Sequence, residues 1–290
     1  MFGVVFVAVI GCSFMQCLYP VGILLPDKRA MYVPCGQCMA CRINRAQDWA
    51  LRLWIESRQY SDLCFVTLTY NDENCSGSLC KRDLQLFNKR LRKARSFRFF
   101  ACGEYGSSTR RPHYHMIVFG IGVDDSVWKG KRYDSRSHGW YCQCDFWPFG
   151  HVYLGEVTPQ SIAYVCKYTT KAVLGKGAVS AYDELCLERP FNTMSRRPGI
   201  GSFVSRDYVE SHNWYHFKDM DRYNKLPRYY VNKFYPAGSE ERSLRTERLS
   251  SIASRCDFEL PASSNFYALS RSRSLELARS MELKHDRSRC

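Results

Sequence analysis

The sequence predicts an α+β protein in which a central antiparallel β-sheet is flanked by helices. Apolar residues recur at helical intervals in residues 44–60 and 81–95. Short runs rich in β-branched and aromatic residues, bounded by turn-forming residues, lie between and after these segments and indicate strands. The chain has 290 residues, of which 45% are apolar, and this is enough for one sizeable core.

The first two elements are a helix and a strand. In residues 44–60, Trp49, Leu53 and Tyr60 recur at helical intervals, which predicts an amphipathic helix. Residues 64–70 are β-branched and aromatic and precede an Asn-Asp pair, so they predict a strand that ends in a turn.

Basic side chains form two candidate phosphate-binding surfaces. The second helix, residues 81–95, has Leu84, Phe87 and Leu91 as its apolar stripe, and its other face carries mostly basic charge. A glycine-proline loop over residues 192–201 carries two adjacent arginines. Both surfaces suit contact with a phosphate backbone, and both equally suit a solvated surface. The candidate DNA-binding residues are Lys89, Arg90, Arg92, Lys93, Arg196 and Arg197.

The rest of the sheet is expected from three further runs. Residues 97–104 and 113–119 are strand-like and are joined by a short polar stretch, which predicts an antiparallel pair. Residues 129–140 are polar and basic and are expected to form a loop. Strand character resumes at residues 151–157.

Net charge narrows the class of partner. There are 42 Lys and Arg residues against 28 Asp and Glu, a formal charge of +14, which favours a polyanionic partner. Aromatic residues make up 14% of the chain and could supply stacking surfaces for unpaired bases beside the cations. Single-stranded nucleic acid suits this combination.

The chain is expected to divide into three segments. Residues 1–33 form an apolar leader, residues 34–230 form the main domain, and residues 231–290 form a basic, Ser/Arg-rich tail that is partly helical or disordered. Residues 1–26 carry no charge, which also suits a signal peptide or membrane anchor. Because a basic start and a clear cleavage site are missing, we expect no stable membrane association.

Two histidines and a glutamate form the first candidate metal site. Residues two apart on a strand project from the same side, so His113 and His115 could offer two nitrogens to one metal. Glu104 falls beside them if the two strands pair across their turn. Two nitrogens and one carboxylate oxygen admit manganese, magnesium, zinc or iron. The alternative is that these histidines are ordinary packing or surface residues.

A helix after the last strand carries the candidate catalytic residues. A Thr-Pro pair predicts its start, and Gly175 and Gly177 are expected to end it. Residues three and four apart share a helix face, so one stripe should contain Tyr164, Lys167, Tyr168 and Lys171. The opposite face packs on the sheet, which leaves both tyrosines facing outward. A phenol has a pKa of about 10, so the lysines or a metal must help it to attack a phosphodiester. The alternative is a simple packing pair.

Cysteine spacing indicates a second candidate metal site. The chain contains 15 cysteines without a regular disulfide framework, which favours a reducing compartment. Cys35, Cys38 and Cys41 could supply three thiolates to a structural zinc ion, with a fourth ligand from elsewhere. A second potential group consists of His138, Cys142 and Cys144. The alternative is that all of these are reduced, buried thiols.

Three ordered motifs give the chain a family resemblance. They are Phe65-Val-Thr-Leu-Thr-Tyr70, then Gly103-Glu-Tyr-Gly106 with Pro112-His-Tyr-His115, and then Tyr164-Val-Cys-Lys-Tyr-Thr-Thr-Lys171. This order resembles that of HUH endonucleases, the initiators of rolling-circle replication. Residues 34–42 and 194–201 resemble the microvirus initiators of the gokushovirus type in particular. The resemblance covers roughly residues 34–201 and neither end of the chain.

The resemblance implies a fold, an activity and site roles. It implies a compact antiparallel sheet, His113, His115 and Glu104 as ligands of Mg²⁺ or Mn²⁺, and Tyr164 and Tyr168 as nucleophiles assisted by Lys167 and Lys171. Such an enzyme nicks the origin of a circular viral DNA, forms a 5′-phosphotyrosine link, leaves a 3′-hydroxyl for synthesis and later rejoins the displaced strand. It would act in the host bacterial cytoplasm with the host replication helicase and polymerase.

Two other functions are compatible with the same residues. The first is a noncatalytic, zinc-containing nucleic-acid-binding protein in which the cysteine cluster organises the fold. The second is a metal-dependent oxygenase or hydrolase that uses the histidines and Glu104 on a small molecule and is indifferent to loss of both tyrosines.

Overall fold

The structure is a computed structural model that describes residues 17–24, 30–106, 109–135, 139–171, 182–211 and 226–247. The chain divides into two compact units. Among the described residues, the sheet unit contains residues 42–203, and the cysteine unit contains residues 17–41 and 204–247. The leader before residue 17, His138, the two glycines expected to end the tyrosine helix and the tail beyond residue 247 lie outside the described residues. The predicted division into three segments stays a prediction.

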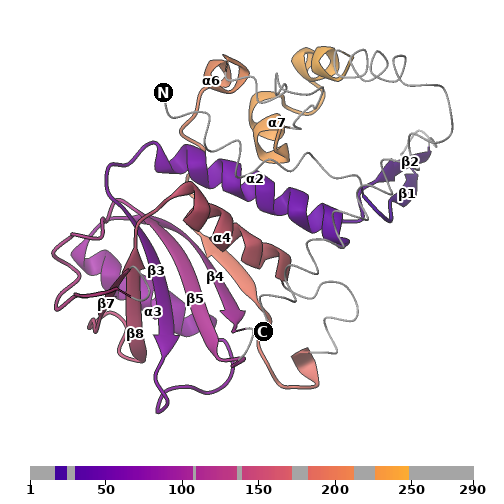
Figure 1. The fold of residues 1–290 in the computed structure, drawn as a ribbon. Helices are drawn as coiled ribbons and strands as arrows, with labels where there is room; N and C mark the ends of the chain where they lie inside the picture. Colours follow the sequence, from indigo (N-terminus) through magenta and orange to yellow (C-terminus); the bar gives the residue numbers. More distant parts are fainter. Residues whose placement is uncertain are drawn as a thin grey trace. The chain divides into compact units, whose positions relative to one another are not determined.

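A seven-stranded antiparallel sheet forms the sheet unit and confirms the predicted α+β class (Figure 1). The strand order is β6-β7-β8-β3-β5-β4-β9. The strands are β3 (Leu63–Tyr70), β4 (Arg98–Tyr105), β5 (Pro112–Phe119), β6 (Arg132–Asp134), β7 (Gly139–Cys142), β8 (Gly150–Gly155) and β9 (Phe191–Met194). The central strands β3, β5 and β4 are the longest, and they carry the motifs.

The loop predicted over residues 129–140 is wrong in part. Short strands β6 and β7 pair with each other there, and β7 pairs with β8. The Tyr133 and Trp140 rings pack edge to face across β6 and β7, 5.2 Å apart, and Lys131 lies over the Trp140 ring. Cross-strand aromatic contacts of this kind stabilise edge strands whose composition is otherwise polar.

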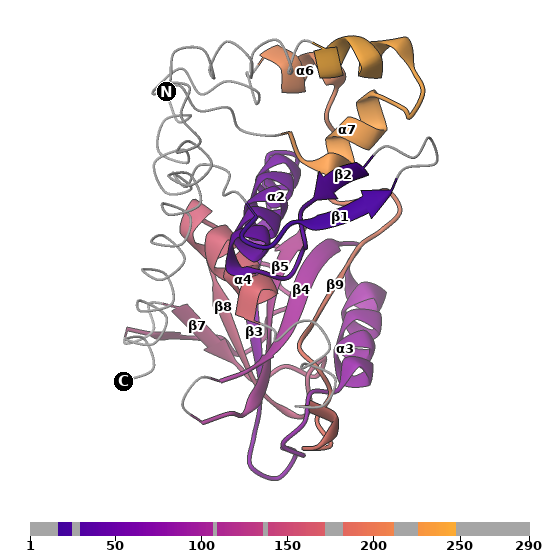
Figure 2. The same cartoon turned by 90° about the vertical axis from the view of Figure 1, so that its right-hand side faces the viewer.

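Helices cover the two faces of the sheet with separate cores. On one face, α3 (Lys81–Ala94) buries the predicted stripe of Leu84, Phe87 and Leu91 against β3, β4 and β5. On the other face lie α2 (Met39–Ser57) and α4 (Pro159–Lys171), with Leu53 and Val165 fully buried. Figure 2 shows α3 separated from α2 and α4 by the sheet. A sheet covered on both faces holds its strand register firmly, because a slip by one residue would exchange the two cores.

The start of α4 is capped as its sequence predicts. The Ser161 N–H donates to Thr158 Oγ1 at 3.2 Å, and the Thr158 N–H donates to Ser161 Oγ at 2.8 Å. Pro159 occupies the first helical position, where its missing N–H costs nothing. The reciprocal bonds set where the helix begins and hence which of its residues face the sheet.

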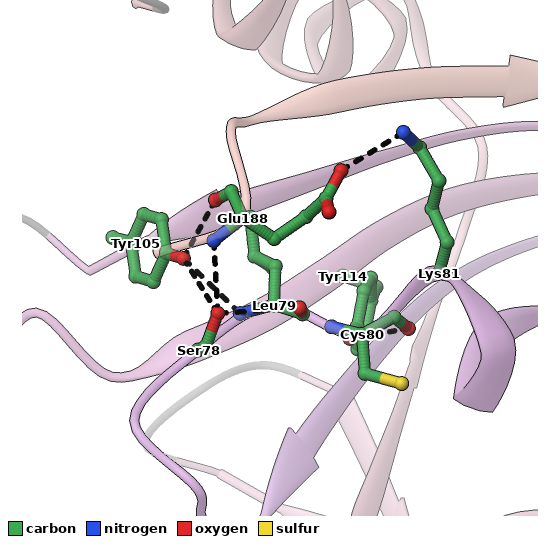
Figure 3. Close-up of polar contacts among 7 residues, drawn as sticks. All are labelled: Ser78, Leu79, Cys80, Lys81, Tyr105, Tyr114 and Glu188. Carbon is green, nitrogen blue, oxygen red and sulfur yellow. Dashed lines mark hydrogen bonds and ion pairs between the residues drawn. The ribbon is translucent and has the colours of Figure 1, made fainter. Parts of the chain in front are cut away.

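A hydrogen-bond network holds the β4 end that carries Glu104 (Figure 3). The Leu79 N–H donates to the Tyr105 hydroxyl at 3.1 Å, and that hydroxyl donates to the Glu188 carbonyl at 2.7 Å. The Glu188 N–H donates to Ser78 Oγ, and the Glu188 carboxylate pairs with a lysine of α3 at 2.9 Å. Tyr105 therefore ties the loop before α3 and the segment before β9 to the end of β4.

The cysteine unit contains a small hairpin and short helices. Strands β1 (Val21–Leu24) and β2 (Ala30–Val33) pair antiparallel. Helices α6 (Arg206–Ser211) and α7 (Arg228–Phe234) follow, and residues 240–247 are also helical. Across the residues that the structure describes, no helix combines the length and apolar character needed to cross a membrane.

Candidate active site and metal centre

The pairing of β4 with β5 brings the three predicted ligands together. Glu104 lies directly opposite His113, and His115 is two residues further along the same face of β5. His113 Nε2 is 2.9 Å and His115 Nε2 is 3.4 Å from Glu104 Oε1. One ligand atom from each residue falls in a group no more than 4.8 Å across, which could hold a metal ion. Such a set suits a divalent cation.

These ligands are held in a largely buried environment. Glu104 is 4% exposed and His115 is 5% exposed, whereas His113 is half-buried. A buried carboxylate is costly unless it is paired, and here two imidazole rings supply the partners. The half-buried His113 leaves one side of the group accessible.

The outer nitrogens of both rings are hydrogen-bonded away from the group. His113 Nδ1 donates to the Arg111 carbonyl at 3.0 Å, and His115 Nδ1 is hydrogen-bonded to Thr67 Oγ1 at 3.0 Å. Because a carbonyl only accepts, the neutral His113 ring carries its proton on Nδ1 and keeps a lone pair on Nε2. This is the arrangement that outer partners impose on metal-binding histidines. Sequence inspection placed Thr67 on a strand face but missed this role.

Helix α4 brings both tyrosines to the histidines. It packs against β4 and β5. The Tyr168 ring stacks on the His115 imidazole with centroids 4.7 Å apart, and the Tyr164 ring meets the same imidazole edge to face at 5.2 Å. The two phenol rings are 4.8 Å apart and perpendicular. The predicted juxtaposition of tyrosines and histidines is therefore present.

The two tyrosines differ in exposure, and the expectation that both face outward is wrong. Tyr164 is 45% exposed, but Tyr168 is only 6% exposed. Tyr168 follows the buried Val165 by three residues, so it continues the apolar stripe that packs on the sheet. Burial, and then the negative charge of Glu104, raises the pKa of Tyr168. Burial also raises the pKa of Tyr164.

The two lysines of the predicted stripe are placed unequally. Lys167 is exposed on α4 between the tyrosines. Lys171 is the last residue of α4, and its side chain lies outside the described part of the chain. Only Lys167 can thus be assigned to the exposed side of the helix, beside Tyr164.

The structure does not bring the predicted phosphate-binding residues to this group. Lys89, Arg92 and Lys93 are exposed on α3, which covers the opposite face of the sheet. The Arg90 guanidinium donates to the Phe146 carbonyl. The pair Arg196 and Arg197 is exposed beyond β9, near the start of β4, whereas Glu104 lies near the end of β4. Their DNA-binding role stays a prediction.

A row of aromatic side chains on the same face as the histidines was missed. In the strand register, Thr67 lies opposite both His115 and Tyr153, and Tyr153 lies opposite Tyr141, so all of these side chains project from one face. The Tyr141 hydroxyl is hydrogen-bonded to His151 Nδ1 at 2.6 Å. The alternation of residues 151–154 predicted a strand, but which face it shared depended on the pairing.

The cysteines are distributed between the two units. Cys142 and Cys144 are buried in the core of the sheet unit, and within the described residues no third candidate ligand completes a metal site with them. Cys35, Cys38 and Cys41 lie in the cysteine unit. Cys17 joins these three, which the spacing alone did not indicate.

Comparison with known proteins identifies the chain as a relative of phage proteins. Residues 63–173, from β3 to just beyond α4, match a family model for replication-associated proteins of the ORF2 type. Replication-associated protein VP4 of Bdellovibrio phage phiMH2K is 30% identical over 249 residues, which cover 77% of this chain and 76% of that protein.

Two further relatives carry similar names. Replication-associated protein ORF4 of Chlamydia phage 1 is 28% identical over 250 residues, covering 77% of this chain and 58% of that protein. Replication-associated protein ORF2 of Spiroplasma virus 4 is 32% identical over 189 residues, covering 59% and 57%. The comparison with solved structures found no match. The chain belongs to the family of microvirus-type phage replication-associated proteins.

Proposed function

We propose that this protein initiates rolling-circle replication by cutting one strand of a circular phage DNA through tyrosine attack and later rejoining it. The observation that carries this proposal is the contact of the Tyr164 and Tyr168 rings with His115, inside a group of three ligand atoms that could hold a metal ion. Family membership supports a role in replication, and the geometry supports the chemistry.

The first step is a transesterification. Glu104, His113 and His115 would hold a Mg²⁺ or Mn²⁺ ion, which when bound supplies positive charge to a nonbridging phosphate oxygen. A tyrosine oxygen attacks the phosphorus and loses its proton, and the bond from phosphorus to the 3′ oxygen breaks. The 3′ oxygen takes up a proton and becomes the primer for synthesis, while the 5′ end stays linked to tyrosine.

The linkage retains the energy of the phosphodiester, so rejoining needs no nucleotide cofactor. A 3′-hydroxyl attacks the phosphotyrosine, and the phenol is released. Two phenols one helical turn apart would allow one to hold a DNA end while the other cuts again. Their rings are 4.8 Å apart, so both can address one phosphate position.

Charge near the phenols bears on their reactivity. The pKa of each tyrosine is raised, mainly by burial, so the phenols are neutral in the absence of a cation. Lys167 is exposed beside Tyr164 and is suited to stabilise the phosphate or the leaving group. The predicted part of Lys171 is the same.

A single strand of DNA would approach along the face that carries the histidines. Tyr141 and Tyr153 project from that face and are half-buried, which leaves ring surface for stacking with unpaired bases. The net charge of +14 favours such a partner. We propose that the host replication helicase and polymerase then extend the 3′ end in the bacterial cytoplasm.

The second candidate function is a noncatalytic, zinc-containing nucleic-acid-binding protein. The grouping of four cysteines in the cysteine unit favours it. It would bind DNA without forming a covalent link, and replacement of both tyrosines would leave its affinity unchanged.

A covalent-capture assay tests the proposal. Purified protein is incubated with labelled single-stranded oligonucleotides tiled across the phage genome, with Mg²⁺, with Mn²⁺ or with a chelator, and is then analysed under denaturing conditions. We expect a protein-linked band only with metal, which disappears in the Tyr164→Phe/Tyr168→Phe double variant and persists in the Tyr133→Phe control, whose tyrosine is exposed on β6. A band of unchanged intensity in the double variant would overturn the proposal.

A further inference from the structure

Four cysteines from two separate segments converge in the cysteine unit. Cys35, Cys38 and Cys41 surround the start of α2, and Cys17 comes from the segment before β1. Their four sulfur atoms all lie within 4.8 Å of one another. The spacing of the last three predicts three ligands, and the fold supplies the fourth.

The sulfur separations match a single tetrahedral ion. With a zinc–sulfur bond of about 2.3 Å, the sulfurs at the corners of a tetrahedron are about 3.8 Å apart. Cys17 Sγ and Cys38 Sγ are 3.9 Å apart. A disulfide needs a sulfur–sulfur distance of about 2.05 Å, and none of the described cysteines forms one.

Backbone N–H groups point at the sulfurs. The Cys35 N–H donates to Cys17 Sγ at 3.2 Å, and the Gln37 and Cys38 N–H groups donate to Cys35 Sγ at 3.4 Å and 3.3 Å. Gly36 has a φ of +75°, a conformation that favours glycine and turns the chain between the first two cysteines. Donors arranged around sulfur favour the thiolate form, which is the form that binds metal.

We infer that Cys17, Cys35, Cys38 and Cys41 bind one zinc ion as a closed tetrathiolate site. Four soft sulfur ligands in tetrahedral arrangement are typical of structural zinc and leave no position for water or substrate. Ligation releases the thiol protons and changes no oxidation state.

The zinc would fasten the β1–β2 hairpin to the start of α2. All four residues of β1 are exposed, and Leu24 is 79% exposed, so the hairpin has little apolar burial of its own. An isolated two-stranded hairpin is marginally stable. Cys17 precedes the hairpin and Cys35 follows it, so a shared ion would close this segment into a loop. The inference does not depend on the proposed DNA cleavage, because these ligands and the Glu104 group belong to different units.

Metal analysis of the purified full-length protein tests this site. We expect about one zinc per chain by inductively coupled plasma mass spectrometry, and replacement by Co²⁺ should give the intense visible bands of tetrahedral cobalt–thiolate coordination. Zinc should be lost in Cys17→Ser. It should persist in the matched controls Cys75→Ser and Cys186→Ser, which change cysteines outside the group.

Two further variants separate ligation from general misfolding and from the catalytic group. Cys17→His should retain the metal, because histidine also binds zinc, but should shift the cobalt spectrum. The His113→Ala/His115→Ala variant should keep the zinc and the thiolate spectrum even if it no longer captures DNA. Wild-type protein without zinc, protein with iron in its place, or a Cys17→Ser variant with unchanged zinc content and cobalt spectrum would each overturn the inference.

Discussion

The phenol ring of Tyr168 lies on the imidazole of His115, with centroids 4.7 Å apart and an angle of 13° between the ring planes. Tyr164 contacts the same imidazole with its edge and remains 45% exposed. The two tyrosines are thus inequivalent before DNA binds. One can be reached from solvent, and the other is part of the core beneath the helix.

This inequivalence predicts the order of attack. The exposed Tyr164 should make the first cut, so Tyr164→Phe should lower covalent capture of single-stranded DNA by about 1000-fold or more, as expected when a nucleophile is lost. Tyr168→Phe should retain the first capture but lose transfer to a second strand. Gel quantification of the protein–DNA band measures both steps.

The position of the link can be read directly, because Lys167 lies between the tyrosines. Trypsin cuts after lysine and separates Tyr164 and Tyr168 into different peptides. Mass spectrometry of the wild-type adduct after a single turnover should find the nucleotide on the peptide that contains Tyr164. A first-turnover adduct on Tyr168 would contradict the predicted order.

The Thr67 hydroxyl should control metal affinity without touching the metal. It is hydrogen-bonded to His115 Nδ1 at 3.0 Å and so orients the ring. Thr67→Val should lower Mn²⁺ affinity about 10–100-fold, the usual effect of losing an outer partner, and Thr67→Ser should restore it. Isothermal titration calorimetry measures the affinity.

The matched control for this experiment is Thr69→Val on the same face of β3. Thr69 Oγ1 contacts the His151 carbonyl and neither candidate histidine ligand. Equal losses of affinity in Thr67→Val and Thr69→Val would indicate a general disturbance of the strand, and the proposed role of Thr67 would then be wrong.

Tyr114 lies between the two histidines in sequence but should affect stability alone. It projects from the opposite face, is fully buried, and accepts the Cys80 N–H at 2.8 Å. It also shares a hydrogen bond with the Tyr70 hydroxyl at 2.8 Å. Tyr114→Phe leaves these groups without their partner, which should cost about 1–3 kcal/mol of unfolding free energy in urea titrations. Mn²⁺ affinity should stay within about twofold, and a larger change would contradict the separation of the two faces.

The register of the site could be predicted because it depends on local rules. Side chains alternate along a strand, and a short turn joins the two strands, so Glu104 was expected beside His113 and is found there. The helix stripe and the Thr158 cap are local features of the same kind. Each of these follows from residues close in sequence.

The burial of Tyr168 and the role of Cys17 could not be predicted in this way. Tyr168 lies at the margin of an apolar stripe, and helical spacing alone does not say how far the sheet extends beneath that margin. Cys17 is separated from Cys35 by a hairpin, so only the pairing of β1 with β2 returns the chain to the other cysteines. Edge strands β6 and β7 were missed because their stability depends on contacts across strands.

The close approach of β8 to β3 gives the last prediction. At Gly150 an added Cβ would lie 2.5 Å from the Asn71 nitrogen and 2.8 Å from the Tyr70 carbonyl carbon, and closer still to the Thr69 carbonyl oxygen. These are backbone atoms, which cannot move aside as a flexible side chain would. Gly150→Ala should therefore lower the unfolding free energy by about 2–3 kcal/mol, as overpacking does.

Gly155→Ala at the other end of β8 is the matched control, because its added methyl would meet only Phe65 Cδ1 at 3.8 Å, an ordinary contact. Its effect should stay within about 0.5 kcal/mol. Urea titration followed by far-ultraviolet circular dichroism measures both variants. If the two substitutions destabilise the protein equally, the cost belongs to alanine in this strand in general. If only Gly150→Ala does, β8 is held against β3 by backbone contact, and the face carrying Tyr153 keeps its position beside the histidines for the same reason.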